Sequence, residues 1–231
     1  MLYIEIIGYI AAFLTAIVGL PLVINTFKTK IPPKVSLLSW WIYYIGILAF
    51  ALLGLALNDF PLIITQVFCG LITITFLVQY YTFLIKKSEK TQANLAFIGL
   101  GIIIYFLILL TLIFYFAKTI PAGKMAPGAT YIGIIAGFCV NIAFLPQTLL
   151  GIKQKTIKFI PLTFLLNLTL LNIFWIIYEF LKLLVEENSN YLSALIFQII
   201  GFIIAVSQLF VYFYQLSQQR KIEKTFKINW I

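Results

Sequence analysis

Histidine is absent from this chain, and charged residues and cysteines are scarce. Of the 231 residues, 10% are charged and two are cysteines, whereas 63% are hydrophobic. A soluble domain is about 25% charged and roughly 45–50% apolar, so the composition excludes an ordinary water-soluble globule. It also excludes a disordered chain, which needs low hydrophobicity and high charge. Without histidine there is no imidazole to serve as metal ligand, general base or pH switch.

The two cysteines, Cys69 and Cys139, stand far apart within apolar stretches. We expect each to be a small buried hydrophobic residue rather than half of a disulfide. The sequence also lacks a Gly-rich phosphate loop, a cluster of metal ligands and a pair of carboxylates at membrane depth. We therefore expect no enzyme activity, no bound metal and no cofactor.

Long apolar runs fill almost the whole sequence. A helix that crosses a membrane needs about 20 consecutive, mostly apolar residues. The segments that meet this length are residues 4–27, 35–57, 60–85, 94–117, 130–152, 160–184 and 191–215. The first has neither a positively charged start nor a small-residue cleavage site, so we interpret it as a retained span rather than a signal peptide. The sequence thus predicts an all-α integral membrane protein with seven transmembrane helices.

Basic residues are divided unevenly between the two sides of this predicted bundle. If the N-terminus lies outside, the inner side holds Lys28, Lys30, Lys34, Lys86, Lys87, Lys90, Lys153, Lys155, Lys158, Arg220, Lys221, Lys224 and Lys227. The outer side then holds only Lys118, Lys124 and Lys182. The positive-inside rule therefore places the C-terminus in the cytoplasm. Since the basic residues are dispersed among loops, the net charge of +9 points to lipid headgroups rather than nucleic acid.

The two halves of the chain share a sequence pattern at an offset of 125 residues. Residues 8–21 and 133–146 have Gly, Ile, Ala, Phe, Ile, Leu and Pro at matching positions. Farther on the offset becomes 132, which aligns Gln66 with Gln198. A unit of three spans ends on the side opposite to its start, so a second copy in the same orientation needs one intervening span. We therefore expect two parallel three-helix repeats joined by a linker helix, a 3+1+3 arrangement.

These repeats define the expected units of the chain. They are residues 1–93 as the first triple-helix repeat, 94–129 as the linker span with an outer loop, 130–217 as the second repeat, and 218–231 as a basic cytoplasmic tail. Short loops and heavy use of Ile, Phe and Lys favour the plasma membrane of a prokaryote. A homo-oligomer stays open.

One motif resembles that of a known family. The segment Phe144-Leu145-Pro146-Gln147 resembles the proline-glutamine motif of the PQ-loop proteins. With residues 133–138, residues 153–155 and the 3+1+3 plan, it makes the chain similar to the SWEET sugar transporters and their half-size bacterial relatives. The first repeat departs from the motif, because Pro21-Leu22 stands where Pro-Gln is expected. The resemblance implies a sugar transporter that works by alternating access.

Two prolines and two glutamines lie inside the predicted spans. Pro21 and Pro146 would kink their helices, and the resemblance implies that they act as hinges, with a static kink as the alternative. A carboxamide in hydrocarbon needs partners, so Gln66 and Gln198 are expected to face the bundle interior. There they would bind a hydroxyl-rich solute or simply join helices by hydrogen bonds.

Aromatic and further amide side chains complete the predicted substrate site. Trp175 matches the tryptophan that the family stacks against sugar rings, and its counterpart in the first repeat is Phe50. Asn172 lies one turn before Trp175 and so shares its helix face, and Asn141 lies about one turn before Pro146. The alternatives are aromatic core packing and polar contacts between helices.

The resemblance also implies an outer gate. Tyr178, Lys182 and Asp59 match its aromatic, basic and acidic positions, so a Lys–Asp pair would close and open. Ordinary interfacial charge is the alternative for Lys182. Glu179 is an acid within a predicted span, but it lies near the outer end, so we expect solvation at headgroup level rather than proton coupling.

Aromatic residues cluster near the inner end of the second predicted span. We expect Trp40 and Trp41 to belong to the interfacial belt. The neighbouring Tyr43 and Tyr44 would then supply bulk to an inner gate.

The preferred function is transport of a small polar, uncharged solute, with sugar as the leading substrate. Since no acidic residue is expected at depth, the sequence favours facilitated diffusion. Alternative solutes are an amino acid, a nucleoside or a vitamin such as nicotinamide riboside. A receptor or scaffold on the same fold ranks lower, because such receptors bind charged peptides and this sequence offers little charge at depth. The expected partners are therefore a small-molecule substrate and the lipid bilayer.

Overall fold

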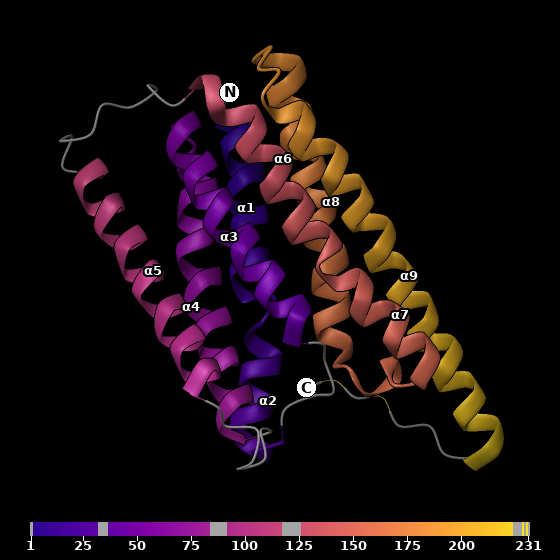
Figure 1. Ribbon diagram of the computed structural model, residues 1–231. Coiled ribbons are helices and arrows are strands. Elements are labelled where there is room, and N and C mark those ends of the chain that lie inside the picture. Colours follow the sequence, from indigo (N-terminus) through magenta and orange to yellow (C-terminus); the bar gives the residue numbers. More distant parts are fainter. Residues whose placement is uncertain are drawn as a thin grey trace.

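The computed structural model describes residues 2–31, 37–83, 92–116, 126–223, 228 and 230. No strand occurs within these ranges. The helices are α1 (Leu2–Ile17), α2 (Leu20–Thr29), α3 (Leu37–Leu57), α4 (Phe60–Phe83), α5 (Gln92–Phe116), α6 (Ala126–Ile142), α7 (Phe144–Gln154), the short 3-10 helix η2 (Ile157–Phe159), α8 (Leu162–Val185) and α9 (Tyr191–Glu223). They run roughly alongside one another in one bundle (Figure 1).

Within the described ranges, six helical stretches are long and apolar enough to cross a membrane. They are Leu2–Thr29, Leu37–Leu57, Phe60–Phe83, Gly128–Gln154, Leu162–Val185 and Tyr191–Lys221, while a shorter apolar stretch, Ala96–Leu112, lies in α5. The predicted all-α architecture with several membrane-length apolar helices is therefore confirmed, whereas six of the seven predicted spans reach membrane length and the one over 94–117 corresponds to the shorter stretch. Lys34, Lys86, Lys87, Lys90, Lys118, Lys124, Lys224 and Lys227 lie outside the described residues, as does the side chain of Gln147.

Two of the predicted spans are broken helices instead of single kinked ones. In place of one helix over 4–27, α1 ends at Ile17 and α2 begins at Leu20. In place of one helix over 130–152, α6 ends at Ile142 and α7 begins at Phe144. α1 and α6 each end four residues before a proline, Pro21 and Pro146 respectively. Proline has no N–H for the carbonyl four residues earlier, and its ring clashes with that carbonyl.

Neighbouring helices bind carbonyl groups that the first break sets free. The Nδ2 of Asn167, on α8, donates to the carbonyl of Leu14 at 2.8 Å. The Sγ of Cys69, on α4, donates to the carbonyl of Thr15 at 3.1 Å, and the N–H of Val18 reaches the same oxygen at 3.2 Å. An unpaired carbonyl in hydrocarbon costs several kcal/mol. These partners therefore allow α1 to end in the middle of the bundle.

The same local features recur in the two halves of the bundle. α2 and α7 each end at a lysine in the left-handed region, Lys30 with φ 57° and Lys155 with φ 55°. α1 packs against α4 and α8, whereas α6 packs against α9 and α3. α3 also packs against α4, and α8 against α9. If α1, α3 and α4 are exchanged with α6, α8 and α9 in that order, the same pairs of helices are in contact. α5 has no counterpart in this exchange and lies against α3 and α4.

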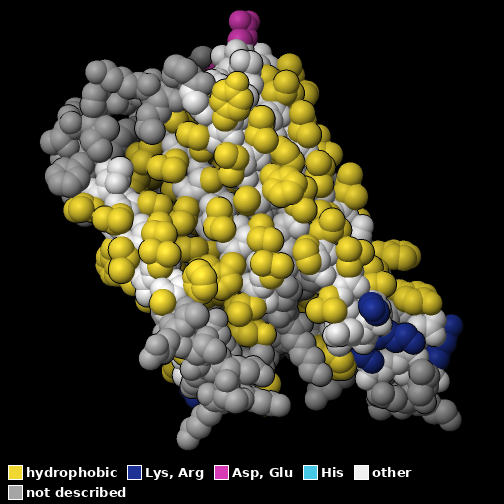
Figure 2. Space-filling model, viewed as in Figure 1, with side chains coloured by type: hydrophobic (Ala, Val, Ile, Leu, Met, Phe, Trp, Pro, Cys, Tyr) yellow, Lys and Arg dark blue, Asp and Glu magenta, His cyan; other side chains and the backbone are white. Residues whose placement is uncertain are grey.

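Charged side chains gather at opposite ends of the bundle, and apolar side chains cover the surface between them (Figure 2). We define the acidic end by Glu5, Asp59, Lys182, Glu186 and Glu187. We define the basic end by Lys28, Lys30, Lys153, Lys155, Lys158, Arg220 and Lys221. An apolar band between two charged ends suits a protein that crosses a bilayer.

Aromatic residues form part of the core toward the basic end. Trp40 is 1% exposed, and its ring lies 4.3 Å from that of Phe76 and 6.0 Å from that of Phe144, between centroids. Its predicted place in the interfacial belt is therefore wrong, because its side of α3 faces other helices rather than lipid. The Tyr44 hydroxyl donates to the carbonyl of Gly101 at 2.7 Å, so Tyr44 joins α3 to α5.

The two halves approach each other most tightly where α3 crosses α6. A Cβ atom added to Gly46 would lie 2.6 Å from Cγ2 of Val140 and 2.8 Å from its backbone nitrogen. Atoms this close must move apart. Glycine at position 46 therefore sets the distance between the two helices.

We expect Gly46→Ala to lower the free energy of unfolding by about 1–3 kcal/mol, a typical cost of overpacking. Gly99→Ala in α5 is the matched control, since nothing lies within 4 Å of its added Cβ. That variant should keep the wild-type stability or gain up to about 1 kcal/mol, because alanine favours helix. Thermal unfolding in detergent checks both. Equal stability of the Gly46→Ala protein and the wild type would contradict the tight crossing.

Candidate functional site

A buried cavity of about 50 Å³ lies between the two halves of the bundle. Its walls come from α1, α3, α4, α6, α7, α8 and α9. The polar lining residues are Thr15, Gln66, Asn141, Asn172, Glu179 and Gln198, and the aromatic ones are Tyr43, Phe50, Phe144 and Trp175. This list contains all six residues that the sequence predicts to bind substrate. Among these six, the structure brings together side chains that are up to 148 residues apart (Phe50 to Gln198).

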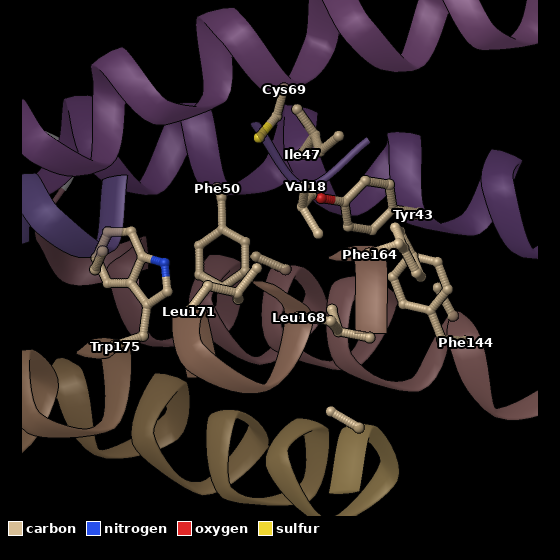
Figure 3. Close-up of a cluster of buried hydrophobic side chains, with 14 of the residues drawn as sticks. Val18, Tyr43, Ile47, Phe50, Cys69, Phe144, Phe164, Leu168, Leu171 and Trp175 are labelled. Carbon is tan, nitrogen blue, oxygen red and sulfur yellow. The ribbon is translucent and has the colours of Figure 1, made fainter. Parts of the chain in front are cut away.

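Trp175 and Phe50 enter the cavity from opposite halves, on α8 and α3 (Figure 3). The Nε1 of Trp175 donates to Oγ1 of Thr15 at 2.7 Å, and that hydroxyl donates to the carbonyl of Ala11 at 2.7 Å. The indole is thereby held in one orientation. Its apolar face and the ring of Phe50 form aromatic walls of the cavity.

Amide groups occupy another part of the wall. The Nε2 of Gln198 donates to Oδ1 of Asn172 at 2.9 Å. The Nδ2 groups of Asn172 and Asn141 donate to backbone carbonyls one turn earlier in their own helices. A Cβ added to Gly201 would collide with Oδ1 of Asn141 and lie 2.8 Å from Oδ1 of Asn172. Because position 201 on α9 is glycine, these amide oxygens can approach α9 closely. A fourth amide, that of Gln66, lines the cavity from α4.

Toward the acidic end, two tyrosines and a carboxylate lie over the cavity. The hydroxyls of Tyr178 and Tyr191 both donate to Oδ2 of Asp59, that of Tyr178 at 2.9 Å. Oδ1 of Asp59 accepts the N–H of Leu62 at 3.0 Å, which makes Asp59 the side-chain cap of α4. The ring of Tyr178 stands edge-on to that of Trp175, with centroids 5.5 Å apart. One carboxylate thus ties α8 and α9 to the α3–α4 turn.

Lys182 has different partners from the one predicted. Its Nζ lies 3.0 Å from an oxygen of Glu5 and 2.8 Å from an oxygen of Glu186. The predicted Lys182–Asp59 pair is therefore not formed in this conformation. Glu186 follows Lys182 by one helical turn, at a spacing where opposite charges meet. Asp59 instead receives the two tyrosine hydroxyls.

Burial is the largest influence on the pKa of Asp59, and it raises that pKa above its ordinary value. The hydrogen bonds from Tyr191, Leu62 and Tyr178 and the charge of Lys182 act in the opposite direction, but they do not outweigh burial. The protonated form of Asp59 is therefore favoured more in the folded protein than in the unfolded chain.

Toward the basic end, aromatic rings narrow the cavity. The ring centroid of Phe144 lies 5.1 Å from that of Tyr43 and 6.0 Å from that of Phe164. Phe144 is the first residue of α7, directly after the helix break and two residues before Pro146. A change in the angle between α6 and α7 would therefore move this ring.

Glu179 is the lining residue whose position sequence analysis misplaced. It was expected at headgroup level, yet its side chain is 4% exposed and lines the cavity. A signal was present, because Glu179 follows Trp175 by four residues and so shares its helix face. Helical periodicity, rather than distance from the helix end, thus indicates the surroundings of Glu179. Thr15 and Tyr191 also belong to the site, and no sequence motif marked them. Phe144 belongs to it as well, and it stands in the Phe-Leu-Pro-Gln motif, which gave it no role of its own.

Comparison with known proteins gives one informative relative. No family model matches the chain. A protein of Leptospira biflexa serovar Patoc, described as the sugar transporter SemiSWEET, is 31% identical over 90 residues. The matched segment covers 96% of that relative and 38% of this chain. Nearly the whole relative therefore corresponds to a part of this chain.

The raised pKa of Asp59 predicts how stability depends on pH. The folded protein retains this proton at pH values where the unfolded chain, with a pKa near 3.8, has lost it. The stability that this retained proton gives the folded protein is fully present below the pKa of Asp59 in the unfolded chain. It is lost as the pH rises through the pKa of Asp59 in the folded protein. We expect the melting temperature of the wild type to fall relative to that of Asp59→Asn as the pH is raised from about 4.

Thermal unfolding in detergent at a series of pH values checks this prediction. Glu187→Gln is the matched control, because Glu187 is an exposed acid at the same end. Its profile should run parallel to that of the wild type. If the Asp59→Asn profile were also parallel, Asp59 would not be the group responsible.

Proposed function

This chain belongs to the SWEET family of PQ-loop membrane proteins, and we infer from this that it carries a sugar across the membrane by alternating access. The relative that places it in the family is described as a sugar transporter. The observation that carries the proposal is the composition of one buried cavity. It combines aromatic rings from both halves with the amides of Gln66, Asn141, Asn172 and Gln198.

The chemistry of this cavity suits a sugar. Sugar rings have apolar faces that pack on aromatic side chains, and Trp175 and Phe50 offer such surfaces. Sugar hydroxyls both donate and accept hydrogen bonds, and each carboxamide supplies two donors and an acceptor. Apolar walls with a few placed polar groups are typical of small-molecule sites.

We further propose that the bundle is a 3+1+3 arrangement of parallel repeats. The first repeat would be α1–α4 within residues 1–93, and the second would be α6–α9 within residues 130–217, with α5 in the linker 94–129. Three observations support it: matching helix breaks, matching lysine caps at positions 30 and 155, and packing contacts that are unchanged when the halves are exchanged.

The helix breaks before Pro21 and Pro146 are the proposed hinges. A broken helix lacks backbone hydrogen bonds at the break, so its two segments change their relative angle at lower cost than an intact helix would. Bending between α6 and α7 would move Phe144 at the basic end of the cavity. Separation of Tyr178 and Tyr191 from Asp59 would open the acidic end, with Lys182 and its two carboxylates beside it.

Membrane orientation follows from the two charged ends. The positive-inside rule favours the basic end in the cytoplasm, so the N-terminus and the acidic end would face outward. In this proposal the membrane is the plasma membrane of a prokaryote.

Cysteine labelling in intact cells tests the orientation. We expect Ser189→Cys, at an exposed position near the acidic end, to react with a membrane-impermeant maleimide. Gln154→Cys, at an exposed position at the end of α7, should react only after the cells are opened. The wild type gives the background, since Cys69 is buried and Cys139 is half-buried. The reverse pattern would invert the proposed topology.

Flux of labelled glucose or sucrose into proteoliposomes tests the transport proposal. We expect Trp175→Ala and Gln198→Ala each to lower the flux by about tenfold or more, the equivalent of about 1.4 kcal/mol of lost interaction. Trp175→Ala removes an aromatic wall, and Gln198→Ala removes an amide and the partner of Asn172. Phe210→Ala is the matched control, because Phe210 is 73% exposed on α9. Its flux should equal that of the wild type.

The choice of labelled solute separates the competing functions. Flux of an amino acid, a nucleoside or nicotinamide riboside without flux of sugar would retain transport and reject the sugar assignment. Saturable binding of a solute with no flux of any compound would favour a receptor on the same fold. Equal loss of flux in Phe210→Ala and Trp175→Ala would show that the cavity is not the site.

A further inference from the structure

One carboxyl group lies in the wall of a cavity that is otherwise lined by uncharged side chains. Glu179 is 4% exposed, and its Oε2 atom has no hydrogen-bond partner among the described residues. The ion pairs found in the described part of the chain all involve Lys182 and do not include Glu179. A buried, unpaired carboxylate is among the most costly groups to place in a membrane protein.

The groups around Glu179 offer it no free positive charge. Lys182, on its own helix, is held by Glu5 of α1 and by Glu186. The α3–α4 turn brings Asp59 within electrostatic reach, and Tyr178 and Tyr191 direct their hydroxyls at Asp59.

The charged residues of the other helices that pack on α8 do not change this balance. Those of α2 are Lys28 and Lys30, and the basic residues of α9 are Arg220 and Lys221, all at the basic end. A neighbouring carboxylate disfavours a second negative charge. Without water in the cavity, the neutral, protonated form of Glu179 is therefore the one that suits these surroundings.

Water and sugar would affect the carboxyl in different ways. A cavity of about 50 Å³ has room for several water molecules, and water filling an empty cavity would hydrate an ionised Glu179. A sugar needs a wider cavity, of roughly 300 Å³ or more, so the helices would have to move apart around it. A sugar that then displaces the water removes much of that hydration, so the carboxyl must be protonated. The sugar-loaded closed state would thus contain a proton, whereas the empty closed state would not need one.

We propose that Glu179 is a proton-binding site of the transport cavity and that each sugar crosses together with one proton. This proposal rests on the proposed transport of sugar and replaces the facilitated diffusion expected from sequence. The carboxylate takes a proton from water when the cavity is open at the acidic end. It returns the proton to water when the cavity opens at the basic end, and no bond other than O–H forms or breaks.

The experiment uses the full chain in proteoliposomes that contain a pH-sensitive dye. An inward gradient of glucose is applied with equal pH on both sides, and labelled glucose and internal pH are followed together. The wild type should acidify the interior as glucose enters, at about one proton per glucose, because one carboxyl carries one proton. Glu179→Gln, which imitates the protonated form, should exchange labelled glucose for internal glucose but lose acidification entirely.

Two further variants separate the role of the carboxyl from general damage. Glu179→Asp retains an ionisable group and should retain acidification. Glu187→Gln removes an exposed acid and should behave as the wild type does. If Glu179→Gln proves unstable, Glu179→Asp and the wild type still decide whether protons accompany glucose.

The outcomes distinguish failure of this proposal from failure of the function on which it rests. Glucose entry by the wild type without acidification overturns the proton site and leaves sugar transport standing. Undiminished acidification in Glu179→Gln assigns the proton to another group and also overturns the proposal. Loss of glucose exchange in a folded Glu179→Gln protein would mean that the ionised carboxylate binds the sugar itself. No entry of labelled glucose, sucrose or other sugar into wild-type liposomes overturns the transport function.

Discussion

Polar groups inside a membrane bundle must find partners within the protein, because hydrocarbon offers none. Here three such partners lie on other helices. The indole of Trp175 bonds to Thr15, the amide of Gln198 bonds to Asn172, and Asn167 binds a carbonyl of the broken helix α1. Each bond joins two elements and fixes the rotation of both. Four of the polar side chains in the cavity wall, namely Thr15, Asn172, Trp175 and Gln198, thus also hold the helices around it.

The helix breaks and the cavity depend on the same constraint. Prolines at 21 and 146 end α1 and α6 in the middle of the bundle, and a helix that ends there exposes carbonyls that neighbouring helices must bind. The breaks also place Thr15 and Phe144 at the cavity, one just before a break and the other just after. In the proposed cycle, the elements that bend and the elements that bind solute are therefore in direct contact.

Glu179 does not follow the general pairing of buried polar groups. Asp59, the other buried acid near it, receives two tyrosine hydroxyls and a backbone N–H. Glu179 shares its helix with Lys182, but that lysine is engaged by Glu5 and Glu186. A carboxyl left without such partners is stable in a closed cavity mainly as the neutral acid. Its placement beside the proposed sugar site is what links solute and proton in our account.

The sequence by itself determined the membrane class and the helix-breaking prolines, and its internal repeat and family resemblance pointed to six of the residues that meet in the cavity. Apolar run length, the missing N–H of proline and helical periodicity are properties of neighbouring residues, so they can be read without the fold. Tertiary structure alone decided the partners and the depth of each side chain. It paired Lys182 with Glu5 instead of Asp59, buried Trp40 in the core, and placed Glu179 in the cavity wall. These outcomes depend on which helix lies opposite and how each is rotated, and on close approaches such as that at Gly201.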